Sequence, residues 1–155
     1  MGRDDEGTVN HVYRLEECAR LAAKSPDPST KVGAIVYNMG GVRHGEGFNS
    51  FAFRSICKAD LVYYNNRELK YDRIIHAEMR ALMMAGNEAF NGSLYTTLVP
   101  CKECAKHICD AGIKTVIFPA ACMRSGWVQR NPAVVQVTMQ LFAESGVTVH
   151  AVGPG

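Results

Sequence analysis

Two short motifs that are well separated in the chain constrain this sequence most strongly, because each supplies part of one metal site. His76 and Glu78 form the pattern H-x-E, and Cys101 and Cys104 follow Pro100 in the pattern P-C-x-x-C. Two thiols with a two-residue gap can reach one metal ion, and an imidazole completes a donor set typical of zinc. Three protein ligands leave one position of a tetrahedral ion open for water. The fold must therefore bring both motifs together.

The spacing within each motif predicts that both lie at the start of a helix. In the middle of a helix, residues two positions apart point about 200° apart, so His76 and Glu78 can face one ion only at a helix start. We therefore expect His76 at the cap or in the first turn. The buried stripe of that helix is predicted at Ala81, Leu82, Met84 and Ala85. Pro100 suits the entry to a second helix, on which Cys101 and Cys104 share one face.

Glu78 is predicted to move protons without binding the metal. Two thiolates cancel the formal charge of a zinc ion, so they acidify its water less than three neutral imidazoles would. A proton acceptor beside the water is then needed, and Glu78 is the candidate. The alternative is that His76 only caps a helix and that both cysteines are buried as small apolar residues. That alternative leaves Glu78 and Pro100 unexplained.

Length and composition predict one domain, 1–155, with 1–9 as a flexible tail. The net charge of +2 implies no broad cationic surface for nucleic acid, so an anionic substrate must be bound locally. No apolar run is long enough to span a membrane, and the polar start of the chain is unlike a secretory leader. The six cysteines then indicate reduced thiols in the cytoplasm, and those outside the metal motif are expected to be packed.

Hydrophobic periodicity predicts an α/β fold. We expect helices at 10–24 with Asn10 as cap, after residue 76, at 102–111 and at 132–145, and strands at 32–37, 42–48, 94–99, 114–118 and 147–152. The helix between the last two strands allows them to run parallel through a right-handed crossover. Residues 50–70 show no clean period, and such a long loop is usually functional. The predicted architecture is a mixed sheet of five strands with helices on both faces.

With both motifs identified, the chain resembles the zinc-dependent cytidine and deoxycytidylate deaminase superfamily, in which H-x-E and P-C-x-x-C occur together. The resemblance is carried by Asp27-Pro28-Ser29-Thr30-Lys31-Val32-Gly33-Ala34, Gly47-Phe48-Asn49, Glu68-Leu69-Lys70-Tyr71 and Ala111-Gly112-Ile113-Lys114. The first two stretches make the chain most similar to deoxycytidylate (dCMP) deaminases. The resemblance implies a three-layer α/β/α cytidine-deaminase-like fold and a homo-oligomer.

The resemblance also implies roles for individual residues. It makes His76, Cys101 and Cys104 the ligands of one catalytic Zn²⁺ and Glu78 the proton shuttle. It further implies that the backbone N–H of Ala77 meets the pyrimidine O2.

Three further substrate contacts come from the same resemblance. Val32 would line the slot for the base, and Asn49 would contact the sugar or its 5′ phosphate. Arg54 lies in a loop where the family often has a basic residue. Arg54 or Lys31 is thus a candidate for the phosphate contact, although Arg54 is as well explained as a solvated surface charge.

Three features depart from the family pattern. Arg80 stands where dCMP deaminases commonly have Asn, and Ser50 follows Asn49 where glycine is usual. The second change puts the triphosphate regulation of the family in doubt. Residues 120–130 match nothing in the pattern. Within them, Trp127 is more typical of a packing anchor than of a residue that stacks on a base.

The predicted function is that of a hydrolase acting on C–N bonds in pyrimidine nucleotide metabolism, converting dCMP to dUMP and ammonia. The alternatives are other amino-bearing substrates: dCTP, a modified cytosine nucleotide, cytosine, guanine or tRNA adenosine. A polynucleotide substrate is disfavoured because residues 147–155 lack a basic tract. A zinc-stabilised binding module is disfavoured because it has no use for Glu78. His107 is disfavoured as a fourth ligand because it would close the metal site.

Overall fold

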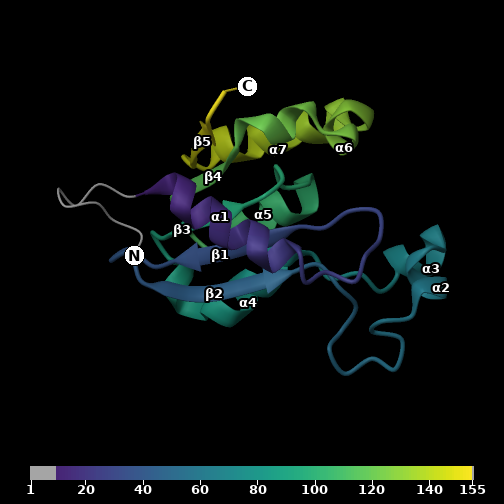
Figure 1. Cartoon of the computed structure of the whole chain (residues 1–155). Helices are drawn as coiled ribbons and strands as arrows, with labels where there is room; N and C mark the ends of the chain where they lie inside the picture. Colours follow the sequence, from purple (N-terminus) through teal and green to yellow (C-terminus); the bar gives the residue numbers. More distant parts are fainter. Residues whose placement is uncertain (1–9, 155) are drawn as a thin grey trace.

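The computed structural model describes residues 10–154 and has a mixed five-stranded sheet at its centre (Figure 1). The strands are β1 (Gly33–Tyr37), β2 (Arg43–Phe48), β3 (Ser93–Thr96), β4 (Thr115–Pro119) and β5 (Thr148–Val152), in the spatial order β2-β1-β3-β4-β5. β1 is antiparallel to both β2 and β3, whereas β3, β4 and β5 run parallel. The predicted mixed sheet and its parallel final pair are confirmed.

Helices cover both faces of the sheet, as predicted. The longer helices are α1 (His11–Ala22), α4 (Ala77–Ala85), α5 (Lys102–Asp110) and α7 (Pro132–Glu144). Successive strand side chains point to opposite faces, so Ile35 and Tyr95 pack with Cys18 of α1. Their neighbours Val36 and Leu94 point the other way, into a larger core formed with α4, α5 and α7. The result is a three-layer arrangement, with α1 on one side of the sheet (Figure 1).

Several short helices were not predicted. They are α2 (Leu61–Tyr64), α3 (Arg67–Tyr71), η1 (Gly86–Ala89), η2 (Ala120–Arg124) and α6 (Gly126–Arg130). α2 and α3 occupy most of the segment without a clean period and stand out beyond one end of the sheet (Figure 1). Asp60 and Asn66 cap them, accepting hydrogen bonds from backbone N–H groups at 2.9 and 3.1 Å. Helices this short contain too few residues to show a helical period.

Close contact between α4 and β2 fixes the direction of α4. A Cβ atom at Gly45 would lie 2.1 Å from the carbonyl oxygen of Ala81, and one at Gly47 would lie 2.7 Å from that of Ala77. Only glycine allows the two backbones to approach this closely. α4 therefore runs antiparallel to β2, and its N-terminus lies at the carboxyl end of that strand.

The structure corrects some details of the prediction. Met84 is 60% exposed, because the row of Ala77, Ala81 and Ala85, spaced four residues apart, faces the sheet instead. β3 ends at Thr96 rather than at Val99. Asn10 caps α1 as predicted, and the tail predicted at 1–9 lies outside the described residues. Within residues 10–154, no helix has the length and hydropathy needed to cross a bilayer.

Candidate active site and metal centre

The three predicted metal ligands lie together at the N-termini of two helices. His76 is the N-cap residue of α4 and Cys101 that of α5, both with extended backbone. Nδ1 of His76 lies 3.1 Å from Sγ of Cys104 and 3.6 Å from Sγ of Cys101. The ligand atoms of all three residues lie within 4.8 Å of one another. The expected place of His76 at a helix start is confirmed.

This donor set fits a zinc ion. Zinc–ligand bonds of about 2.0–2.3 Å in a tetrahedron place the ligand atoms roughly 3.5 Å apart, close to the two separations that involve His76. Among residues 10–154, no other histidine, cysteine or carboxylate joins this cluster. His107 is turned away, with Nδ1 2.8 Å from the carbonyl oxygen of Glu103. Three protein ligands are thus available, and the fourth position is left to a non-protein ligand.

A hydrogen bond between the side chains of Cys101 and Cys104 shifts their pKa values in opposite directions. The hydrogen bond from Cys104 lowers the pKa of Cys101, although burial alone would raise it. The same hydrogen bond raises the pKa of Cys104. The N-termini of both helices add partial positive charge beside the sulfurs. A thiolate therefore forms readily at Cys101, and a metal ion must displace the remaining proton from Cys104.

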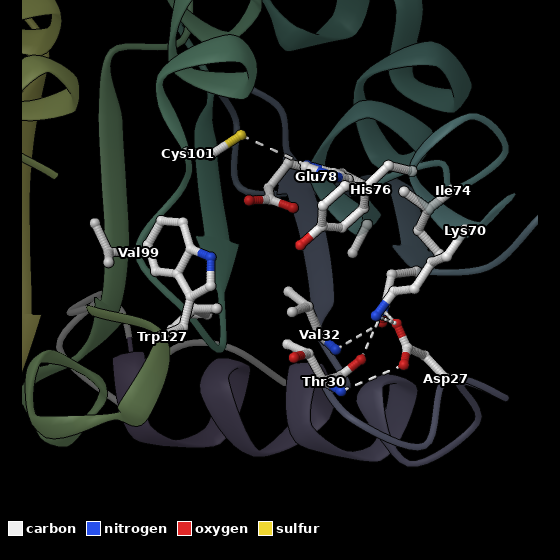
Figure 2. Close-up of a pocket in the computed structure, with 14 residues that line it drawn as sticks. Asp27, Thr30, Val32, Lys70, Ile74, His76, Glu78, Val99, Cys101 and Trp127 are labelled. Atoms are coloured by element: carbon white, nitrogen blue, oxygen red, sulfur yellow. Dashed lines mark hydrogen bonds and ion pairs between the residues drawn. The ribbon is translucent and has the colours of Figure 1, made fainter. Parts of the chain in front are cut away.

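Glu78 lies in the first turn of α4 and is only 5% exposed. Burial raises the pKa of Glu78 to about 7, although the positive charge of His76 opposes the shift. Figure 2 shows its carboxylate directed into the open space between Cys101 and Val32. A carboxyl group whose pKa lies near 7 can both accept and release a proton at neutral pH.

A cavity of about 130 Å³ adjoins Glu78 and the metal cluster. Val32, Asn49 and Ala77, which the resemblance suggested as substrate contacts, line it. Arg54 and Lys31 lie outside it. Arg54 is exposed in the loop that follows β2, and Nζ of Lys31 donates a hydrogen bond to the carbonyl oxygen of Ser25.

The side chain of Asn49 forms hydrogen bonds with the loop before β1. Its Oδ1 accepts from the backbone N–H of Val32 at 2.8 Å, and its Nδ2 donates to the carbonyl oxygen of Thr30 at 2.7 Å. Nδ2 also lies 3.4 Å from Oδ2 of Asp27. Asn49 therefore shapes one wall of the cavity by holding that loop in place.

An ion pair that was not predicted closes the same side of the cavity. Nζ of Lys70 lies 2.7 Å from Oδ2 of Asp27, whose side chain is 1% exposed, and donates to Oγ of Ser29 at 2.9 Å. Burial would raise the pKa of Asp27, but hydrogen bonds from Lys70 and Ser29 outweigh burial and lower it. Both partners lie in stretches that carried the resemblance, yet nothing local in the sequence indicates that they meet.

Trp127 forms the opposite wall beside Val99, as Figure 2 shows. It lies on α6, where Ser125 caps the helix and Nδ2 of Asn131 donates to the carbonyl oxygen of Trp127 at 2.8 Å. Trp127 also packs against the larger core. It is thus the packing anchor that was predicted, and a wall of the cavity as well.

Residues 8–120 match the family model of the cytidine and deoxycytidylate deaminase zinc-binding region. The chain belongs to the cytidine and deoxycytidylate deaminase family. The predicted superfamily is confirmed, and zinc is the metal that both the matched region and the donor set indicate. The match ends within η2, so α6 and Trp127 lie outside the part of this chain that the family model describes.

Relatives and solved structures agree with this assignment. Deoxycytidylate deaminase of Mus musculus is 40% identical over 103 residues, which cover 63% of this chain and 57% of that protein. The chain thus spans less than two thirds of that relative. An uncharacterised deaminase of Aliivibrio fischeri is 31% identical over 141 residues, which cover 88% of this chain and 89% of that protein.

The structure of dCMP deaminase from the cyanophage S-TIM5 in complex with dCMP and dUMP superimposes with a TM-score of 0.67. The two chains are 23% identical, and the superposition covers 91% of this chain and 95% of the phage protein. This likeness establishes a shared fold, and the predicted three-layer deaminase fold is confirmed.

Proposed function

We propose that this deaminase hydrolyses a cytosine nucleotide, converting dCMP and water to dUMP and ammonia. The observation that carries the proposal is the buried carboxyl of Glu78, which faces the same small cavity as the His76, Cys101 and Cys104 cluster. Family membership and the similarity to a deoxycytidylate deaminase support the choice of substrate.

In this reaction Glu78 moves protons between water and the base. His76, Cys101 and Cys104 would hold the zinc ion, which when bound would supply Lewis acidity to the attacking water. Glu78 accepts a proton from that water and gives it to N3 as the C4–O bond forms. It then passes the second proton of the water to the amino group, which leaves as ammonia when the C4–N bond breaks. A pKa near 7 suits a group that must act as both base and acid.

The start of α4 offers a contact for the base. The first N–H groups of a helix have no partner within the helix, and Ala77 lines the cavity at this position. In the proposed complex the N–H of Ala77 donates to the pyrimidine O2, and Val32 packs against the ring. Asn49 supports the wall through its bonds to the loop before β1.

The proposal is tested by comparing turnover of dCMP, dCTP, deoxycytidine, cytosine and guanine by the zinc-loaded protein. We expect dCMP to be deaminated most efficiently. Glu78→Gln should retain zinc and the melting temperature while losing turnover by roughly 10²–10⁴-fold or more, the range for a positioned acid–base group. A metal-replete protein that is inert toward all five compounds, or a Glu78→Gln variant with substantial turnover, would refute the proposal.

Two further predictions belong with this proposal. The first is that the protein is located in the cytoplasm. This proposal is supported by the six cysteines, all of which are free thiols in the structure. A homo-oligomer, which the family resemblance implied, also stays a proposal for this chain.

A further inference from the structure

A second hollow, of about 470 Å³, adjoins the reaction cavity. Thr30, Lys70, Tyr71 and Trp127 line both spaces. Because the two hollows share these residues, the second hollow lies next to the space beside Glu78. The family model ends before α6, so this second space is shaped partly by a segment that the family model does not describe.

The charged side chains that line the second hollow are basic. They are Arg67 of α3, Lys70, and Arg130 of α6, and within residues 10–154 no aspartate or glutamate lines it. Lys70 is neutralised by Asp27 at 2.7 Å. Arg67 and Arg130 are exposed, and among residues 10–154 no carboxylate forms an ion pair with either of them. Two guanidinium charges therefore remain available to a ligand.

Local structure gives these two arginines defined positions on opposite helices. The guanidinium carbon of Arg67 lies 5.6 Å from the ring centroid of Tyr71, one turn further along α3. On α6, a Cβ atom at Gly126 would lie 2.8 Å from Nη1 of Arg130, so the glycine leaves room for the arginine to fold back along its helix. Arg67 thus lies beside Tyr71, and Arg130 lies on the same short helix as Trp127. Both hollows share these two aromatic residues.

We propose that Arg67 and Arg130 bind the 5′ phosphate of the nucleotide whose base occupies the reaction cavity. This inference rests on the proposed deamination and assigns the substrate class: a nucleoside monophosphate in preference to a nucleoside or a free base. A guanidinium can bind phosphate through two parallel hydrogen bonds, and two guanidinium charges match the charge of a monophosphate at neutral pH. The assignment replaces Arg54 and Lys31, which line neither hollow.

The experiment uses the zinc-loaded full chain and the variants Arg67→Gln and Arg130→Gln. Lys114→Gln is the matched control, because Lys114 is exposed and directly precedes β4, whereas the cavity residues Leu98 and Val99 follow the carboxyl end of the neighbouring parallel strand β3. Calorimetry gives the Kd of dUMP and of deoxyuridine, and kinetics give kcat/KM for dCMP and for deoxycytidine. Melting temperatures check that each variant is folded.

We expect each arginine variant to weaken dUMP binding and to lower kcat/KM for dCMP by about tenfold or more, the scale of a lost hydrogen bond to a charged group. Binding of deoxyuridine should change by less than about twofold, because deoxyuridine carries no phosphate, and Lys114→Gln should match the wild type for every ligand. Arg130→Lys should retain part of the dUMP affinity, since it keeps the charge but loses the bidentate geometry.

The inference is overturned if both arginine variants bind dUMP as Lys114→Gln does, or if the wild type binds deoxyuridine as tightly as dUMP. It is also overturned if a single-stranded oligodeoxycytidine is deaminated more efficiently than dCMP, since the phosphate would then belong to a polynucleotide. Failure of the proposed reaction is a separate result: dUMP affinity that depends on Arg67 and Arg130, without turnover of dCMP, would retain the phosphate site and reject deamination.

Discussion

Nη1 of Arg80 donates a hydrogen bond of 2.7 Å to Oγ of Ser50. These are the two residues that depart from the dCMP deaminase pattern, and the structure places them in contact. Ser50 in turn exchanges backbone hydrogen bonds of 3.2 and 2.8 Å with Ile75, which precedes His76. Arg80 also donates to the carbonyl oxygen of Phe48 at 2.8 Å. The two departures thus form one unit that ties the metal-binding end of α4 to the loop after β2.

This contact predicts energetic coupling between Arg80 and Ser50. Arg80→Met should lower the free energy of unfolding by about 2–4 kcal/mol, because it leaves buried hydrogen-bond acceptors without a donor. Ser50→Ala removes the same contact from the other side, so the double variant should lose less stability than the two single variants together. We expect a coupling energy of about 1–2 kcal/mol from urea unfolding. Additive losses would show that the two side chains do not act as a unit.

The ion pair of Asp27 and Lys70 predicts a pH-dependent contribution to stability. The folded pKa of Asp27 lies below its ordinary value, so the ionised carboxylate stabilises the fold above the unfolded pKa of about 4. This contribution is lost as the pH falls through the folded pKa. Asp27→Asn should therefore lower the free energy of unfolding at pH 7 by about 1–3 kcal/mol, and the difference from wild type should shrink toward pH 3.

Urea unfolding of both proteins in the same buffers measures this difference, since protonation of the zinc ligands then affects both alike. Asp110→Asn is the control, because Asp110 is exposed at the end of α5 and should change stability by less than about 0.5 kcal/mol. A difference between Asp27→Asn and wild type that stays constant from pH 7 to pH 3 would contradict the assigned role of the ion pair.

The metal site predicts that removal of one ligand abolishes zinc binding. Cys104→Ala should reduce the metal content from about one ion per chain to near zero and should lower the melting temperature, because metal binding contributes to folding stability. A chelator should have the same effect on the wild type. Cys57→Ala, at a cysteine outside the metal cluster, should retain the full zinc content by plasma mass spectrometry. Equal metal content in the two variants would rule out this ligand set.

Trp127 is the only tryptophan of the chain, and it lines both hollows. Its fluorescence should therefore change when dUMP binds, and the titration should saturate with the Kd measured by calorimetry. Trp127→Phe should keep an aromatic wall and bind dUMP within about fivefold of wild type, without the signal. If the tryptophan fluorescence did not change at saturating dUMP, the ligand would lie away from Trp127.

The chemistry of the metal site could be predicted from the sequence because it depends on local properties. Two cysteines with a two-residue gap restrict the geometry of the ligands and their position on a helix. A histidine two residues before a glutamate does the same, whichever elements surround the motif. The α/β class could also be predicted, since the strands and the longer helices carry periodicities of their own. α2, α3 and α6 could not, because four or five residues do not complete enough turns to show a pattern.

The walls of the cavity were decided by the tertiary structure. Asp27 meets Lys70 in the cavity wall, and outside the cavity lining Ser50 meets Arg80, across segments whose packing no local periodicity describes. The same packing brings Arg67 and Arg130 to the second hollow and leaves Arg54 outside both spaces. The sequence by itself determined which side chains are candidates to hold zinc and to move a proton, because those properties belong to the residues. Which cations and aromatic rings line the cavity and the second hollow depends on how separate helices pack around the sheet, and only the folded chain decides that.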